Sequence, residues 1–145
     1  MCSKIALLWR KCIAQWRYFF NPNVRRGRRG ERCAARFLKH QGYVILDRNW
    51  RCGRYELDIV AKYATCVVFV EVRGRLSSSL QSGIDTVDKK KKQAILKAID
   101  AYRRQHKGIN TFRFDVISID WDAHGKIQNL NHYENVPLRF YRGVL

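Results

Sequence analysis

The stretch Thr65-Cys-Val-Val-Phe-Val-Glu-Val-Arg73 decides the fold, because it is an almost continuous run of β-branched and aromatic residues. Such a run is typical of a strand that is buried on both faces of a sheet. One acid, Glu71, interrupts the run, and Arg73 follows two positions later on the same face. A carboxylate in a buried strand is costly unless it is paired or functional. Glu71 is therefore the first candidate for a residue with a chemical role.

The segments on either side of this strand predict an α/β domain with a mixed sheet. Hydrophobic periodicity favours a helix, three strands, a second helix and then one or two further strands, in that order. The glycine-containing segments 24–30 and 74–83 are expected to be loops. The expected helices span about 31–41 and 86–105, and the expected strands span 43–49, 55–62, 65–73, 112–119 and, at an edge, 126–133.

Two further acids lie on the strand that precedes the buried one. The period of two places Glu56 and Asp58 on one face of that strand, and Leu57 and Ile59 on the other. If the two strands form a hairpin, Asp58 lies beside Glu71. Neighbouring carboxylates repel each other unless a positive charge lies between them. With oxygen ligands alone, that charge is most naturally Mg²⁺ or Mn²⁺, which would polarise a phosphodiester and activate a bound water.

Three charged residues near this pattern each have two interpretations. Glu31, at the start of the expected first helix, either completes the acid cluster or interacts favourably with the helix N-terminus. Arg73 either stabilises charge on a phosphate or forms a structural salt bridge with Glu71. Asp115 lies on the same strand face as Arg113, and we expect it to pair with Arg113 rather than to take part in catalysis.

The net charge of +17 on 145 residues indicates a polyanionic partner, with nucleic acid as the first hypothesis and an anionic membrane surface as the second. The net charge is +12 over the first 54 residues and +5 over the remaining residues. Arginines in a loop and lysines on a helix surface can follow a phosphate backbone. The residues expected to contact nucleic acid are Arg28, Arg29, Arg75, Lys89, Lys90 and Lys92.

Other features narrow the class of protein. The five cysteines and four histidines lack the spacing of a zinc site or a disulfide framework, so we expect reduced thiols, surface histidines and a cytoplasmic location. No transmembrane segment is expected. Residues 1–23 are expected to form a basic amphipathic extension and residues 24–145 a single domain. Within the extension, residues 4–20 either lie on an anionic membrane or pack on the domain or stay loose.

Five blocks of the sequence, in order and with matching spacing, resemble the YraN family of bacterial proteins. The resemblance covers most of the chain, from about Gly27 to Ile119. That family is similar to restriction-endonuclease-like proteins, which have a mixed sheet flanked by helices, and archaeal Holliday-junction resolvases are closest in pattern. The blocks are Gly27-Arg-Arg-Gly-Glu31, Arg54-Tyr-Glu-Leu-Asp-Ile-Val60, Phe69-Val-Glu-Val-Arg-Gly-Arg75, Lys89–Gln93 and Arg113-Phe-Asp-Val116.

The resemblance implies a metal-dependent endonuclease that acts on DNA rather than RNA, including branched or damaged DNA, and a homodimer by analogy with the resolvases. It implies Asp58 and Glu71 as metal ligands and Glu31 as a supporting acid. Arg73 occupies the place of the usual lysine. Lysine is a compact charge that can transfer a proton, whereas arginine keeps its proton. Two functions therefore stay open: Mg²⁺-dependent cleavage, or binding of nucleic acid by a nuclease fold that has lost most or all of its activity.

Overall fold

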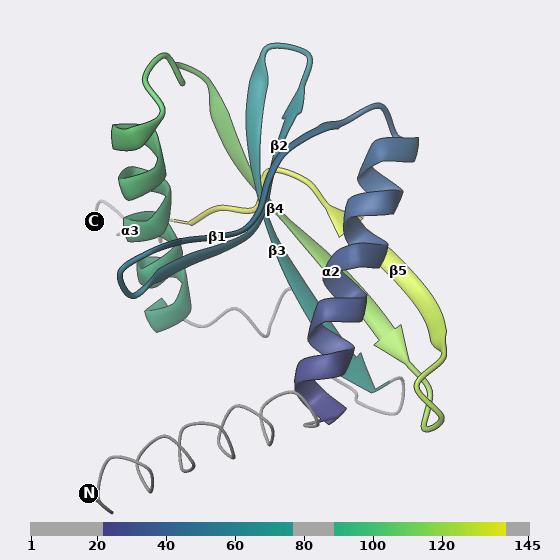
Figure 1. Cartoon of the computed structure of the whole chain (residues 1–145). Coiled ribbons are helices and arrows are strands. Elements are labelled where there is room, and N and C mark those ends of the chain that lie inside the picture. The colour runs from purple at the N-terminus through teal and green to yellow at the C-terminus, as the bar shows by residue number, and fades with distance from the viewer. Residues whose placement is uncertain (1–21, 77–88, 139–145) are drawn as a thin grey trace, which may run out of the picture.

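The computed structural model describes residues 22–76 and 89–138, which form two helices and five strands (Figure 1). The order of these elements along the chain is the predicted one. They are α2 (Pro22–His40), β1 (Val44–Cys52), β2 (Tyr55–Tyr63), β3 (Cys66–Leu76), α3 (Lys89–Gln105), β4 (Phe112–Trp121) and β5 (Ile127–Tyr133).

The five strands form one mixed sheet in the order β1-β2-β3-β4-β5. Strands β1, β2 and β3 are antiparallel neighbours, β3 and β4 are parallel, and β5 is antiparallel to β4 at the edge. Helix α3 packs on one face of the sheet and α2 on the other (Figure 1). This α/β arrangement, a mixed sheet flanked by helices, is the restriction-endonuclease-like fold that the sequence predicts.

The central strand β3 is buried on both faces, as its composition predicts. Phe69 packs with Ile95 and Ile99 on the side of α3, whereas Val68 packs with Leu38 on the side of α2. All five side chains are buried. The removal of apolar surface from water, at roughly 25 cal/mol per Å², therefore holds a helix against each face of β3. The acid that β3 carries therefore lies on a strand that is packed on both faces.

Residues 24–30, which were predicted to form a loop, belong to helix α2. Pro22 is the first helical residue, a position that suits proline because its φ angle is already helical and its missing N–H is not needed there. Gly30 is buried, and a Cβ at this position would lie 3.4 Å from the Cδ1 atom of Ile119. Gly30 thus permits close packing of the helix on the sheet rather than a flexible loop. Because α2 begins so early, Glu31 lies in mid-helix, and its interpretation as an N-terminal residue is wrong.

Strand β3 also extends further than predicted, because residues 74–76 continue it instead of beginning a loop. Gly74 is suited to this position, since a Cβ there would come within 2.8 Å of the Nε1 atom of Trp121. The predicted loop and helix residues in 77–88 and the amphipathic segment 4–20 lie outside the described residues. Within the described ranges, no helix is long and apolar enough to span a membrane.

Candidate active site and nucleic-acid interface

The carboxylate of Asp58 lies where the pairing of β2 with β3 ends. The register of the two strands ends with Ile59 opposite Val70, and Asp58 is the residue that precedes Ile59 on β2. The backbone N–H of Val72 donates a hydrogen bond of 2.8 Å to Asp58 Oδ2. The side chain of Asp58 thus continues the contact between the two strands where the ladder stops, and this bond fixes the position of the carboxylate.

The alternation that was predicted for β2 breaks at the same point. Leu57 packs in the core beneath α3, whereas Ile59 packs in the core beneath α2. A regular strand would place both on one face, so the predicted grouping of Leu57 with Ile59 is wrong. On the N-terminal side of Asp58, β2 is paired with β1 alone, and the two strands form a hairpin that extends away from β3 (Figure 1). Asp58 therefore lies at a bend of the sheet rather than within it.

Glu71 follows Val70 on β3 and is the buried acid of the site, with a side chain that is 7% exposed. Two cations approach its Oε1 atom, the Nε of Arg73 at 3.3 Å and the Nζ of Lys91 at 3.0 Å. Arg73 lies two residues further along β3, whereas Lys91 comes from the first turn of α3. The structure thus brings together Asp58, Glu71 and Arg73, which were predicted site residues, and adds Lys91, which was not.

The proximity of the two acids changes the acid–base properties of Asp58. Burial, followed by the negative charge of Glu71, raises the pKa of the Asp58 carboxyl from its ordinary 3.8 to about 7. The hydrogen bond from Val72 and the charge of Lys91 act in the opposite direction but do not outweigh these causes. A divalent cation favours the charged form of both carboxyl groups at once. The acid pair therefore has the oxygen donors and the electrostatic need that fit Mg²⁺ or Mn²⁺.

Buried polar atoms near the acid pair lack hydrogen-bond partners. Of the four buried side-chain atoms without a partner in the described residues, three belong to Glu31, Arg73 and Ser118. Ser118 lies opposite Arg73 in the register of β3 and β4. The Arg73 Nε atom is within ion-pair distance of Glu71, but its N–H is not directed at the carboxylate. Since buried polar groups are normally paired, this region is suited to a polar ligand.

Glu31 extends from the middle of α2 towards the same region. Burial raises the pKa of its carboxyl, and a hydrogen bond with the Asn49 side chain opposes this shift. The charge of Glu31 also contributes to the raised pKa of Asp58. In the part of the chain that the structure describes, no three His, Cys, Asp or Glu side chains are grouped so as to hold a metal ion. An ion at the acid pair would have Asp58 and Glu71 as its protein ligands, and water and phosphate oxygens would complete its coordination, as is common for Mg²⁺.

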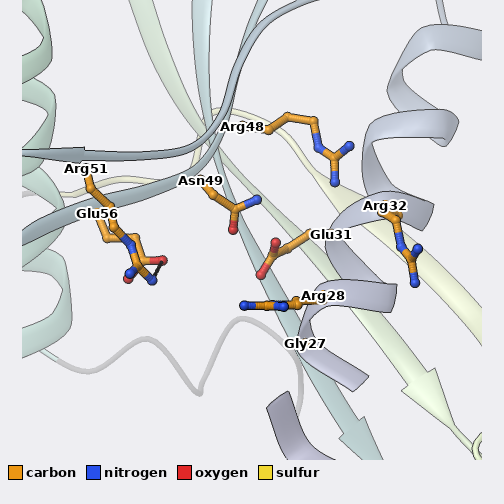
Figure 2. A pocket seen from close by; sticks show the side chains of 8 residues that line it. All are labelled: Gly27, Arg28, Glu31, Arg32, Arg48, Asn49, Arg51 and Glu56. Carbon is orange, nitrogen blue, oxygen red and sulfur yellow. Dashed lines mark hydrogen bonds and ion pairs between the residues drawn. The ribbon is translucent and has the colours of Figure 1, made fainter. Parts of the chain in front are cut away.

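A cleft of about 800 Å³ opens between α2 and β1 beside Glu31. Figure 2 shows Glu31 and Arg28 of α2 extending towards Asn49 of β1. Half of the residues that line the cleft are arginines, and one of these, Arg51, is paired with Glu56 at 2.8 Å. Guanidinium groups bind phosphate oxygens through two parallel N–H donors, so this lining favours a phosphate-bearing ligand. The cleft is lined by Gly27, Arg28, Glu31, Arg32, Arg48, Asn49, Arg51 and Glu56.

Comparison with known proteins assigns the chain to a family. The model of the uncharacterised protein family UPF0102 matches residues 30–119, which is more than half of the chain. The chain belongs to the UPF0102 family. This is the YraN family that the five sequence blocks resemble, so the resemblance is confirmed. The matched residues include the acid pair and both cations beside it.

UPF0102 proteins of three bacteria are similar to this chain over most of their own length. The UPF0102 protein of Porphyromonas gingivalis is 40% identical over 118 residues, which cover 81% of this chain and 87% of the relative. That of Pelotomaculum thermopropionicum is 37% identical over 110 residues, covering 75% and 92%. That of Pseudomonas putida is 37% identical over 103 residues, covering 70% and 84%. The similarity to these relatives therefore covers 70% or more of this UPF0102 protein.

The arginines that were predicted to bind phosphate have different surroundings in this UPF0102 protein. Arg28 lines the cleft, as a phosphate-binding role requires. Arg29 instead donates a hydrogen bond of 2.8 Å to the backbone oxygen of Gly125. Arg75 is half-buried and forms an ion pair of 2.5 Å with Asp120, its partner in the β3–β4 register. A phosphate would have to compete with these partners at Arg29 and Arg75.

The predicted lysines lie at the start of α3, where Lys90 is exposed and Lys92 is half-buried. The side chain of Lys89 lies outside the described part of the structure. Three further arginines of the cleft were not predicted from the sequence. Arg32 follows Arg28 by four residues, a helical spacing that indicates the same face and was available in the sequence. Arg48 and Arg51 come from β1, and only the tertiary fold brings them opposite α2.

Asp115 is paired with Arg113, as predicted, at 3.1 Å between Oδ1 and Nε. It is fully buried and also accepts hydrogen bonds of 2.9 Å from His132 Nε2 and from the backbone N–H of Asn135. Burial acts to raise the pKa of this carboxyl, but these donors outweigh it and the pKa is lowered. The side chain of His132 is only 10% exposed, so the prediction of surface histidines is wrong for this residue. The network ties β5 to β4 and has a structural role.

Proposed function

We propose that this protein is a metal-dependent nuclease that hydrolyses phosphodiester bonds in DNA. The observation that carries the proposal is the proximity of two acids, Asp58 and Glu71, at the bend of the sheet. Burial and the charge of Glu71 raise the pKa of Asp58 to about 7 there. Perturbed acids beside a basic cleft are characteristic of functional sites, since a fold gains no stability from repulsion between two carboxylates. The arginines of the cleft support nucleic acid as the ligand.

Each residue of the site has a distinct role in this proposal. Asp58 and Glu71 would hold Mg²⁺ or Mn²⁺, and the ion would polarise the phosphate and make a bound water acidic. Arg73 stabilises the negative charge that develops on the phosphate. Glu31 is a supporting acid that reaches Asp58 electrostatically. The arginines of the cleft bind the phosphates that flank the scissile one, which positions the strand without reading its sequence.

Hydrolysis exchanges one phosphorus–oxygen bond for another. The oxygen of a water molecule attacks phosphorus, and the bond from phosphorus to one sugar oxygen breaks. The electron pair of the broken bond stays with the leaving oxygen, which takes up a proton from solvent. The water loses one proton to solvent, so the reaction consumes one water and leaves one phosphomonoester and one hydroxyl.

One observation favours a second candidate function, which is binding of nucleic acid without cleavage. Both Arg73 and Lys91 approach the same oxygen of Glu71, so this carboxylate has two counterions within its own chain. Arginine in place of lysine also removes a residue that can transfer a proton. A binding module of this kind shows salt-sensitive affinity for DNA and no turnover.

Incubation of the purified protein with duplex, single-stranded and four-way-junction DNA in Mg²⁺ or Mn²⁺ separates the two functions. We expect cleavage of at least one substrate, and a loss of at least about 100-fold in Asp58→Asn and in Glu71→Gln. Asp100→Asn is the matched control, because Asp100 is an exposed acid on α3. Intact DNA of all three kinds in both metals would overturn the nuclease and leave the binding module. Light scattering of the same sample tests the homodimer that the resemblance implies.

A further inference from the structure

Lys91 brings a cation to the acid pair from helix α3. Its Nζ atom lies 3.0 Å from Glu71 Oε1, the atom that Arg73 Nε approaches at 3.3 Å. The Glu71 side chain is 7% exposed, whereas that of Lys91 is 40% exposed. The carboxylate is therefore the fixed, buried end of this ion pair. The ammonium lies at the boundary with solvent on a flexible four-carbon stem.

The helix directs Lys91, rather than the lysine before it, towards the acids. Lys91 precedes Ile95 by four residues, and Ile95 precedes Ile99 by four, so the three lie along one stripe of α3. Ile95 and Ile99 are buried against the sheet. Lys90, one position earlier, is exposed. Within the lysine run 89–92, the spacing thus selects Lys91 as the residue whose side chain continues the packed stripe to the acid pair.

The position of Lys91 is not one that helix stability alone would favour. The helix dipole places positive potential at the first turn of α3, where a cation is slightly unfavourable. Glu71 compensates for this, but Glu71 already has Arg73 beside it on the same strand. The ammonium of Lys91 can therefore leave Glu71 without leaving a buried carboxylate unpaired. This freedom is greatest when another cation reaches the acid pair.

On the basis of the nuclease function proposed above, we propose that Lys91 is a catalytic residue that changes its partner between the metal-free and the substrate-bound protein. In the metal-free protein its ammonium pairs with Glu71. With a divalent ion at Asp58 and Glu71, the ammonium is repelled from the carboxylate and turns to an oxygen of the scissile phosphate. Lys91 thereby supplies the compact, mobile charge that Arg73 does not.

The contribution of Lys91 is electrostatic and transfers no proton. Its ammonium donates a hydrogen bond to a phosphate oxygen on which negative charge grows as water attacks phosphorus. Lysine suits this change of partner, because its three donors rotate freely at the end of the stem. The guanidinium of Arg73 is a planar fork and its side chain is less exposed, 30% against 40%.

The test compares Lys91→Met with Lys97→Met, which removes the same charge from an exposed position of the same helix. Calorimetric titration with Mn²⁺ alone measures ion affinity, and single-turnover cleavage in saturating Mn²⁺ measures the rate. We expect Lys91→Met to bind Mn²⁺ roughly tenfold more tightly, because a competing cation has been removed. We expect the same variant to cleave about 100-fold more slowly. Lys97→Met should match the wild type in both measurements.

These opposite changes distinguish a catalytic cation from a structural ion pair. A structural pair predicts a lower Tm for Lys91→Met and an unchanged rate in saturating Mn²⁺. If Lys91→Met does not fold, Lys91→Arg, which keeps the charge, replaces it. We expect Lys91→Arg to keep the wild-type Mn²⁺ affinity and to cleave more slowly, because its rigid fork cannot follow the phosphate. Wild-type cleavage in the folded variant, or unchanged Mn²⁺ affinity in Lys91→Met, would overturn the role of Lys91.

Failure of the nuclease function itself has a different signature, because it shows in the wild type. A wild-type protein that binds no Mn²⁺, or that cleaves no DNA in saturating Mn²⁺, overturns the proposed function and the role of Lys91 with it. A wild-type protein that does both, together with Lys91 variants that behave like Lys97→Met, overturns the role of Lys91 alone.

Discussion

At the scale of single residues, Asp58 links the architecture of the sheet to its chemistry. Its carboxylate accepts the Val72 N–H where the β2–β3 ladder ends, and the negative charge of Glu71 acts on the same carboxylate. The hydrogen bond fixes the group in space, while burial and repulsion raise its pKa. The Asp58 side chain thus continues the contact between two strands. It is also subject to repulsion from Glu71, which a bound cation would reduce.

The raised pKa of Asp58 predicts how the stability of the metal-free protein depends on pH. The carboxyl has a pKa of about 7 in the folded chain and an ordinary value of 3.8. Between these values the folded chain holds a proton that the unfolded chain has released, so a rise in pH favours unfolding. We expect the urea midpoint of the metal-free protein to fall between about pH 4 and about pH 7, and to fall less in Asp58→Asn. Equal decreases in the two proteins would contradict the assignment.

At the scale of secondary-structure elements, the candidate site depends on two departures from regularity. The β1–β2 hairpin leaves the sheet beyond Asp58, and α2 begins at Pro22 instead of Glu31. The cleft forms because the hairpin and the extended helix face each other (Figure 2). Its basic lining is therefore a product of how the elements are placed, and no single run of sequence contains it.

Removal of arginines from both walls of the cleft should weaken DNA binding. We expect Arg32→Ala/Arg48→Ala to lower affinity at moderate salt and to reduce the slope of log K against log[salt] by about 2, because each arginine neutralises one phosphate. Fluorescence anisotropy over a salt series measures both quantities. The control is Arg36→Ala/Arg104→Ala, which has the same net charge and lies outside the cleft. Equal decreases in affinity in the two double variants would show that only total charge matters.

Gly27 in α2 and Gly74 in β3 should respond in opposite ways to an added methyl group. Gly27→Ala meets no atom within 4 Å and should stabilise the helix by about 0.5–1 kcal/mol. Gly74→Ala places a Cβ within 2.8 Å of Trp121 Nε1 and should destabilise the fold by about 1–3 kcal/mol. Denaturant unfolding measures both changes. A stabilised Gly74→Ala protein would contradict the packing described for β3 and β4.

At the scale of the whole molecule, the arrangement of elements was predictable and the composition of the site only partly so. The strand 65–73 fixed the centre of the sheet, because only a doubly buried strand has so many apolar residues in sequence. The proximity of Asp58 to Glu71 was predictable because the strands that carry them, 55–62 and 65–73, were expected to form a hairpin. The helical character of 24–30 was hidden, because the benefit of Gly30 arises from a contact with Ile119 that is distant in sequence. Lys91 was missed for a related reason, since only the packing of α3 shows which lysine of its run faces the sheet.

The network at Asp115 stabilises the sheet by tying the edge strand β5 to β4. Replacement of Asp115 by Ala leaves Arg113 and His132 without their buried partner, and should cost about 3–5 kcal/mol of unfolding free energy. Chemical denaturation measures the loss, with the exposed Asp100→Ala as the control, which should be close to wild type. A change below about 1 kcal/mol in Asp115→Ala would contradict a structural role for this residue.

The central claim is that Asp58 and Glu71 hold a divalent ion against a phosphodiester. The most direct measurement is the anomalous difference density of crystals grown with Mn²⁺ and a short DNA oligonucleotide. We predict one strong peak within coordination distance of oxygens from both carboxylates, together with a phosphate oxygen at the same ion. Flat density between the carboxylates in saturating Mn²⁺, with Lys91 still paired to Glu71, would contradict it.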